Sequence, residues 1–297
     1  MSATLSRLDG FLLLLLTVVW GANWPIMKLG VTEVHPYTFR TVTMIGGLAI
    51  FALVAWLQGH HLAIARRHWR ETAVLSTTNM VVWYALSALG IQLLSSGRAA
   101  ILGYTLPVWV ALIGTVVYGE RHGVRLLFAL GSAAVGVGLL LASEFGAMTG
   151  RPLGTVCLLA AAAAWALGTH QLRRRVQKTP IVVLSFWMMA VTLAVCAVLA
   201  FVFERQHWNR WPSRAAWWAI GYNAVLAYGI AQLIWFRIAA ALPPVVSALS
   251  VMMIPVIGVL AGQWMLGEQP GWTDYVALAA ILVAIGASLL PRGGPAR

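Results

Sequence analysis

The stretch PVWVALIGTVVYGE at residues 107–120 recurs in altered form as PVIGVLAGQWMLGE at residues 255–268. Six of the fourteen positions are identical, among them the leading proline and the closing Gly-Glu pair. The two stretches lie 148 residues apart, which is half of the 297-residue chain. This spacing predicts an internal duplication, with one repeat over residues 1–146 and the other over residues 147–297.

Less common residues outside these stretches repeat in the same order. Chance matches in an apolar sequence involve mainly Leu, Val and Ala, so ordered matches of Asn, Tyr and Trp strengthen the prediction of a duplication. Their offsets, 144 and 145 residues, are close to that of the longer stretch. The matches pair Asn79 and Tyr84 with Asn223 and Tyr228, and Trp20 with Trp165.

The composition indicates a membrane protein. Hydrophobic residues make up 61% of the chain and charged residues only 9%, whereas a soluble domain has about 25% charged residues. The apolar residues run continuously and do not alternate with polar ones, which favours helices over barrel strands. We therefore expect an all-α integral membrane protein. A disordered chain, a disulfide scaffold and a soluble enzyme are excluded.

Ten apolar segments are long enough to span a membrane, which takes about 20 residues. Each repeat would hold five transmembrane helices. Because five is odd, the second repeat would be inverted relative to the first, an architecture common among secondary transporters. The expected spans are 9–29, 36–58, 69–92, 97–118, 123–143, 152–172, 180–203, 214–237, 243–266 and 272–290.

Basic residues set the expected orientation, since cytoplasmic loops carry an excess of Lys and Arg. With both termini in the cytoplasm, the inner segments hold thirteen basic residues and the outer segments six, while Arg40 remains within a predicted helix. We therefore expect a multi-pass protein with cytoplasmic termini. The net charge of +12 reflects these loops and does not indicate nucleic-acid binding. Cys157 and Cys196 lie in apolar runs and are interpreted as packing residues.

The sequence WGANW at residues 20–24, the prolines Pro107 and Pro255, and the Gly-Glu pairs ending the repeated stretches resemble those of the EamA-type carriers. These carriers belong to the drug/metabolite transporter superfamily, and the resemblance covers the whole chain. Within the family, the tryptophan-rich sequence looks most like the bacterial inner-membrane exporters of aromatic amino acids. The resemblance implies ten helices, of which the first, third, fourth, sixth, eighth and ninth surround a central cavity, and it implies export.

Polar and aromatic residues inside the predicted spans are the candidate substrate-binding groups. Trp20, Asn23 and Trp24 share one face of the first helix. An asparagine in lipid is costly unless it has a partner or faces a cavity. Hydrogen bonding between helices is the alternative role for such residues. The expected substrate-binding set is Trp20, Asn23, Trp24, Asn79, Trp83, Tyr84, Tyr104, Trp109, Trp165, Tyr228 and Gln232.

Two pairs of equivalent residues frame the repeated stretches. Pro107 and Pro255 lack an N–H group and weaken the helix around them. We expect either static kinks there or bends that open and close the cavity. Glu120 and Glu268 would lie on opposite sides of the membrane, where we expect them to cap helices or anchor loops.

The titratable residues argue against buried acid–base chemistry. All eight carboxylates fall at predicted helix ends or in loops, and His170 alone among the histidines lies within a predicted span, near its cytoplasmic end. Proton exchange through a membrane-embedded carboxylate therefore has no visible carrier. The sequence contains no metalloprotease, hydrolase or nucleotide-binding motif. We expect no enzymatic activity, no metal and no cofactor.

These observations predict a transporter in the bacterial inner membrane that exports amino acids, aromatic and other large neutral ones, by alternating access. Trp and Tyr side chains would stack on the substrate, and a few amides and hydroxyls would orient it. An exporter of other amphiphilic metabolites or drugs, cations included, remains an alternative. A membrane-embedded lipid-group transferase and a non-transporting scaffold are remoter ones. The expected partners are a small-molecule substrate and the bilayer, with no nucleic acid; the oligomeric state is open and a monomer is allowed.

Overall fold

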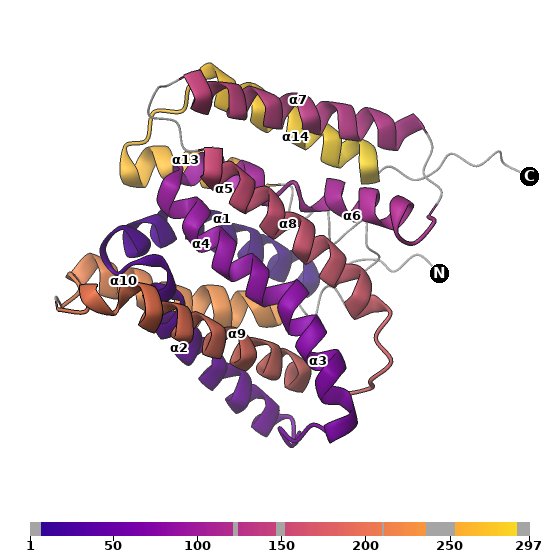
Figure 1. The fold of residues 1–297 in the computed structure, drawn as a ribbon, viewed down its shortest axis with the longest axis vertical. Coiled ribbons are helices and arrows are strands. Elements are labelled where there is room, and N and C mark those ends of the chain that lie inside the picture. The colour runs from indigo at the N-terminus through magenta and orange to yellow at the C-terminus, as the bar shows by residue number, and fades with distance from the viewer. Residues whose placement is uncertain (1–6, 121–123, 147–151, 210, 236–252, 290–297) are drawn as a thin grey trace, which may run out of the picture.

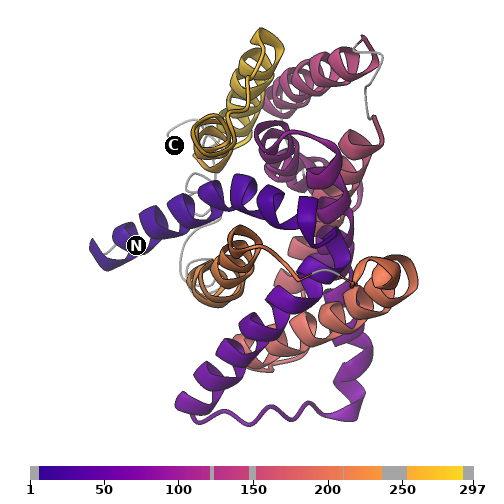
Figure 2. The same ribbon diagram turned by 90° about the vertical axis from the view of Figure 1, so that its left-hand side faces the viewer.

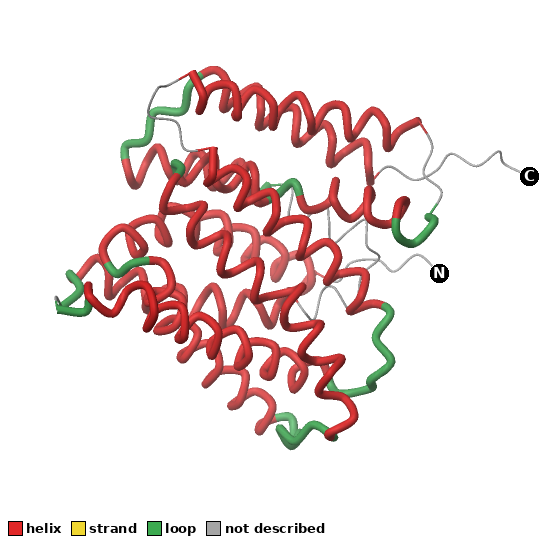
Figure 3. The backbone as a smooth tube through the Cα atoms, in the orientation of Figure 1, coloured by secondary structure: helices red, strands yellow, loops and turns green. Residues whose placement is uncertain are grey.

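The computed structural model describes residues 7–120, 124–146, 152–209, 211–235 and 253–289. Within these ranges the chain forms helices and loops and contains no strand (Figure 3). The all-helical membrane class is thereby confirmed, while the count of ten helices stays a prediction. Six described segments are long and apolar enough to cross a membrane: Gly10–Glu33, Pro36–Leu57, Arg66–Leu93, Ser96–Val116, Pro152–Arg173 and Ile181–His207.

The first half contains α1 (Arg7–Glu33), α2 (Pro36–Leu57), η1 (Arg66–His68), α3 (Trp69–Ser76), η2 (Thr77–Val81), α4 (Val82–Leu93), α5 (Ser96–Gly103), α6 (Leu106–Val116) and α7 (Val124–Gly146). The π-helical segment η2 joins α3 to α4 without a break. The single helix expected over 97–118 is interrupted, because Tyr104 and Thr105 separate α5 from α6.

The second half contains α8 (Pro152–Arg173), α9 (Ile181–Glu204), η3 (Arg205–His207), α10 (Arg214–Tyr222), η4 (Asn223–Ala231), α13 (Ile254–Leu266) and α14 (Trp272–Leu289). The π-helical segment η4 continues α10. The first part of the span expected over 243–266 lies outside the described residues.

The helices pack in pairs that join the two halves. α7 packs along α14 at the upper edge of Figure 1, and α2 packs along α9. α4 and α6 both contact α8, while α1 contacts α13 and η4. Figure 2 shows α1 crossing the middle of the molecule. These pairings leave α1 and α8 at the centre of the molecule, where each packs against helices of the other half.

The Gly-Glu pair of each repeated stretch ends a helix in the same way. Gly119 and Gly267 have φ values of 66° and 63°, in the left-handed region that glycine adopts without strain. The following N–H turns back: that of Glu120 donates to the Gly114 carbonyl at 2.8 Å, and that of Glu268 to the Gly262 carbonyl at 3.3 Å. Each glycine N–H donates four residues back, to the carbonyl of Thr115 or Gln263, so both are helix ends of the αL type.

A second glycine in each stretch makes room for the glutamate side chain. A Cβ atom on Gly114 would lie 2.6 Å from Oε2 of Glu120, and one on Gly262 would lie 2.6 Å from Oε2 of Glu268. The pattern G-x4-G-E therefore encodes a helix end whose carboxylate folds back over the last turn. Both glutamates thus lie at helix ends, as expected from the sequence.

Candidate functional site

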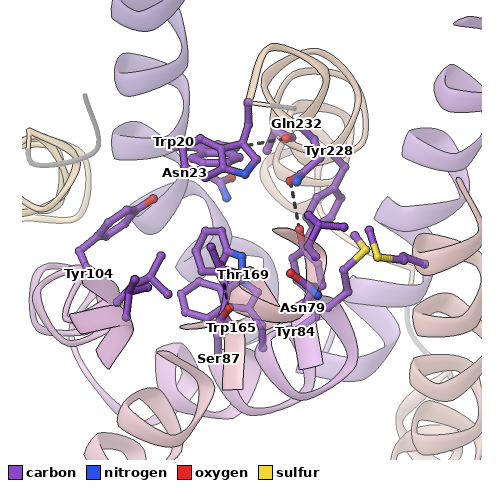
Figure 4. A pocket seen from close by; sticks show the side chains of 18 of the residues that line it. Trp20, Asn23, Asn79, Tyr84, Ser87, Tyr104, Trp165, Thr169, Tyr228 and Gln232 are labelled. Carbon is purple, nitrogen blue, oxygen red and sulfur yellow. Dashed lines mark hydrogen bonds between the residues drawn. The ribbon is translucent and has the colours of Figure 1, made fainter. Parts of the chain in front are cut away.

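A cavity of about 320 Å³ lies between the two halves, with walls from α1, α2, α4, α8 and η4. This volume is near the lower end of the range for small-molecule sites, about 300–1,000 Å³. Ten of the eleven residues expected from the sequence line it, and Figure 4 labels most of them. They are Trp20, Asn23, Trp24, Asn79, Trp83, Tyr84, Tyr104, Trp165, Tyr228 and Gln232.

Trp109 and the two prolines are placed differently from the rest. Trp109 is half-buried and is not among the residues that line the cavity. Pro107 does line it, as the second residue of α6, and Pro255 is the buried second residue of α13. Neither proline is in mid-helix. Each lies in the first turn of its helix, where proline is tolerated because a backbone N–H would have no intrahelical partner there. The break beside Pro107 lies at Tyr104 and Thr105.

Four tryptophans from four elements form one wall of the cavity, and Trp165 of α8 is their centre. Its ring centroid lies 4.7 Å from that of Trp83, 6.5 Å from that of Trp20 and 6.3 Å from that of Trp235. Trp20 and Trp235 are 5.7 Å apart. The rings meet edge-on or tilted, the geometries that aromatic pairs prefer. This tryptophan wall (Trp20, Trp83, Trp165 and Trp235) offers flat apolar surface to a ligand.

The interruption between α5 and α6 brings another aromatic side chain into the cavity. Tyr104 packs edge-on against Trp24, with ring centroids 6.2 Å apart. The preceding Gly103 permits this approach, because a Cβ atom there would lie 2.9 Å from the Trp24 ring. The end of α5 thus packs against α1, a contact that the local sequence does not reveal.

A group of polar side chains also lines the cavity. Tyr84 and Tyr228, whose positions match in the sequence comparison of the two halves, pack edge-on with centroids 5.1 Å apart. The Tyr84 hydroxyl lies 3.5 Å from Oε1 of Gln232. Arg40 donates hydrogen bonds to the hydroxyl of Tyr228 and, at 3.0 Å, to that of Ser87. The equivalent tyrosines therefore meet at one buried guanidinium.

Arg40 is the site residue that the sequence reasoning missed. In the sequence analysis, Arg40 is treated only as a basic residue that lies within a predicted span. That position was itself a signal, since ionisable residues inside membrane spans mark substrate or ion pathways. Ser87, Thr169 and Met188 also line the cavity and were not singled out.

The repeated asparagines both lie in π-helical segments, Asn79 as the third residue of η2 and Asn223 as the first residue of η4. The Asn79 side-chain amide donates to the Leu75 carbonyl at 3.0 Å, and that of Asn223 donates to the Ala219 carbonyl at 3.1 Å. Both carbonyls lie four residues earlier, where a regular α-helix would use the backbone N–H. The Ala219 carbonyl also accepts the backbone N–H of Asn223, so the side-chain hydrogen bond there is an additional one. Asn79 lines the cavity, whereas Asn223 is fully buried and does not.

One end of the molecule is closed by contacts between helix ends; we call it the Glu268 end. There Lys28 Nζ donates to the carbonyls of Ile91, Gln92 and Leu94, which end α4. No described residue of the loops at this end lines the cavity. Further contacts at this end are Glu268 with Ser96, Glu204 with Thr38, Glu33 with Ser213, and Arg98 with Asp274.

The opposite end, the Glu120 end, carries cavity residues up to the last turn of α8. Arg173 and Arg175 line the cavity there. Glu71 accepts the N–H groups of Val176 and Gln177, at 2.7 and 3.1 Å, and so holds the segment after α8. The cavity therefore extends from mid-molecule towards the Glu120 end.

His170 belongs to this end and not to the cavity. Its Nε2 lies 2.9 Å from the Val110 carbonyl, and its ring stacks on Tyr118 at 4.9 Å. Its Nδ1 lies 3.8 Å from Glu120. Among the described residues, no group of three or more His, Cys, Asp and Glu side chains is arranged to hold a metal.

Comparison with known proteins gives relatives over nearly the whole chain. "Uncharacterized transporter YoaV" of Bacillus subtilis is 24% identical, with 91% of this chain and 92% of the relative covered. "Uncharacterized inner membrane transporter YedA" of Escherichia coli is 23% identical, covering 93% and 90%. The Escherichia coli "Probable amino-acid metabolite efflux pump" is also 23% identical, covering 95% and 94%.

A comparison with solved structures and a comparison with family models agree with these relatives. A solved crystal structure matches with a TM-score of 0.66 at 20% identity, over 95% of this chain and 98% of the other. The model of the EamA-like transporter family matches twice, over residues 9–142 and 152–290. The protein is therefore a membrane transporter that belongs to the EamA-like transporter family.

Proposed function

We propose that the protein exports amino acids, aromatic and other large neutral ones, by alternating access through the cavity. The observation that carries this proposal is the tryptophan wall around Trp165, because flat apolar side chains stack favourably on such rings. Asn79, Tyr84 and Gln232 add a few orienting polar groups, the usual composition of small-molecule sites. The relative named as an amino-acid metabolite efflux pump supports the same substrate class.

Transport would rest on two inverted five-helix repeats, residues 1–146 and 147–297. The two separate family matches support this division. The packing supports it as well: α1 contacts α13 and η4, and their counterparts α8, α6 and η2 make the equivalent contacts. Alternating access would then be a rocking of one repeat against the other around the cavity.

The orientation that we propose places both termini in the cytoplasm of a bacterial cell. The relative named as an inner membrane transporter supports an inner-membrane location. The Glu120 end would then face the cytoplasm and admit substrate. Release would require the contacts of the Glu268 end to separate, and the first turns of α6 and α13, at Pro107 and Pro255, are where we expect these helices to swing.

Flux into proteoliposomes tests this function. Purified protein should move labelled L-phenylalanine, L-tryptophan and L-leucine faster than empty liposomes do, and move glycine and L-glutamate poorly. Tetraphenylphosphonium in the same panel tests the alternative of drug export. Absence of flux for every large neutral amino acid would contradict the proposal, and chemical conversion of the substrate would favour an enzyme.

A further inference from the structure

We propose that Arg40 binds a carboxylate group of the substrate, so that the cavity selects molecules with an anionic group and an apolar body over organic cations. This inference rests on the proposed function of the cavity as the transport site. It adds that Arg40 contacts the substrate and that the cavity prefers an anionic group. Neither statement follows from the tryptophan wall alone.

The first observation is the depth of the charge. Arg40 is only 2% exposed and lies one turn into α2, a segment that is apolar enough to span the membrane. A guanidinium in such a place is costly, and ionisable residues there serve a pathway or are paired. Arg40 should therefore have either a carboxylate partner or a ligand.

Within the described part of the chain, the partners of Arg40 are all neutral. They are the hydroxyls of Tyr228 and Ser87, and the rings of Tyr84 and Tyr228, whose centroids lie 5.1 and 5.9 Å from the guanidinium carbon. Its Nε is buried and has no hydrogen-bond partner. Among the described residues, the guanidinium thus has no carboxylate to balance its charge, and its Nε–H has no acceptor.

Described carboxylates at the Glu268 end are committed to other partners. Glu204 packs on the start of α2, but its oxygens accept the N–H groups of Tyr37 and Thr38 at 2.9 and 2.7 Å. Asp274 pairs with Arg98 at 2.5 Å, so a partly buried arginine at the same end does have a carboxylate. Arg40 differs from Arg98 in lining the cavity.

The rest of the cavity has the matching charge pattern. None of its described lining residues is acidic, and Arg173 and Arg175 line it towards the Glu120 end. An organic cation would meet three arginines there and no carboxylate. A zwitterion would still find acceptors for its ammonium group, since the Asn23 side-chain oxygen is buried without a partner. This arrangement favours a carboxylate on Arg40 and rejects ligands whose only charge is positive.

A charge series on one carbon skeleton tests the inference by calorimetry on full-length protein in nanodiscs. The probes are L-phenylalanine, 3-phenylpropionate, which lacks the amine, and phenethylamine, which lacks the carboxylate. We expect the two carboxylates to bind at least tenfold more tightly than phenethylamine. Arg40→Gln should weaken their binding about 10- to 100-fold without weakening that of phenethylamine. Arg40→Lys should recover part of the loss, and Arg66→Gln, on an exposed residue of η1, should bind as wild type does.

Three results would overturn the inference. One is binding of phenethylamine as tight as that of 3-phenylpropionate. The second is an equal loss for all three probes in Arg40→Gln, which would mark a structural role. The third concerns chloride or acetate as competitors of the carboxylate probes. Equal competition in wild type, Arg40→Lys and Arg40→Gln would show that these anions do not compete at Arg40. Should Arg40→Gln not fold, the wild-type series and Arg40→Lys still decide.

The experiment separates this inference from the proposed function. If no aromatic probe binds, 4-methylpentanoate and 3-methylbutylamine repeat the charge contrast on an aliphatic skeleton. A carboxylate preference there would keep the role of Arg40 and remove the aromatic substrates. Conversely, flux of L-phenylalanine that is unchanged in Arg40→Gln would keep the exporter and remove the carboxylate site.

Discussion

Glu268 and Ser96 join the end of α13 to the start of α5: Oε1 of the glutamate accepts the serine N–H at 2.7 Å, and Oε2 accepts its hydroxyl at 2.9 Å. The N–H of Gly97 also donates to Oε2, at 3.2 Å. An anion is favoured at a helix N-terminus, where N–H groups lack partners. The contact stabilises the closed Glu268 end, and in our proposal it must break for release.

The glycine that admits this carboxylate should be intolerant of a methyl group. In Gly262→Ala the new Cβ would lie 2.5 Å from the Ser96 hydroxyl oxygen and 2.6 Å from Glu268 Oε2. We expect a loss of about 1–3 kcal/mol in the free energy of unfolding, as for other overpacked sites. Thermal unfolding in detergent measures it.

The matched control is Gly221→Ala in α10, where a Cβ would meet nothing within 4 Å. That variant should be neutral or more stable, since alanine favours a helix over glycine by about 0.5–1 kcal/mol. Equal unfolding temperatures for Gly262→Ala and wild type would show that the carboxylate is not held as the structure has it.

The tryptophan wall should matter more for binding than any exposed tryptophan. Trp165→Leu removes three ring contacts, each worth about 0.5–1.5 kcal/mol beyond buried area. We expect about tenfold weaker binding of L-phenylalanine, with a smaller effect on L-leucine. Trp264→Leu, at a side chain 87% exposed on α13, is the control and should bind normally. Equal effects of the two variants would argue against a cavity role for Trp165.

The sequence predicted those features that local chemistry determines. Apolar length predicted the six described segments that can cross a membrane. The repeated Gly-Glu pairs located two helix ends, because the left-handed conformation of Gly119 and Gly267 favours glycine. The shared face of Trp20, Asn23 and Trp24 followed from helical periodicity, and all three line the cavity.

Features that depend on contacts between distant elements escaped prediction. The interruption at Tyr104 agrees with Pro107, which has no N–H to donate to the Gly103 carbonyl four residues earlier. The packing of Trp24 of α1 against Gly103 and Tyr104 is the long-range part, which the sequence does not show. The prolines suggested mid-helix kinks, yet each begins a helix. The sequence places Arg40 within a span, but its partners Ser87 and Tyr228 come from other helices and are visible only in the structure.

The membrane orientation is testable with two cysteine positions. Cys157 and Cys196 are buried and would first be replaced by alanine. Asn209→Cys, beyond η3, and Lys178→Cys, between α8 and α9, are both exposed. With cytoplasmic termini, a membrane-impermeant maleimide should label Asn209→Cys in intact cells and Lys178→Cys only after permeabilisation. The reverse pattern would contradict the proposed orientation.

The groups that could carry protons lie away from the cavity. His170 is held by the Val110 carbonyl and Glu120, and it does not line the cavity. Glu71 and Glu204 accept backbone N–H groups at the two ends of the molecule. A proton-coupled carrier commonly uses a group in the pathway that changes charge, and none of the described lining residues is a carboxylate or a histidine.

We therefore predict that transport runs down the substrate gradient, with little or no coupling to protons. The pH dependence of the rate does not test this, because ionisation of the substrate alone alters flux. The decisive measurement is accumulation of L-phenylalanine in proteoliposomes with an imposed proton gradient and a clamped membrane potential. The internal concentration should rise to the external one and stop there, in wild type and in His170→Gln alike. Accumulation well above the external concentration that vanishes in His170→Gln would make His170 the coupling residue, and would require it to reach the cavity in another conformation.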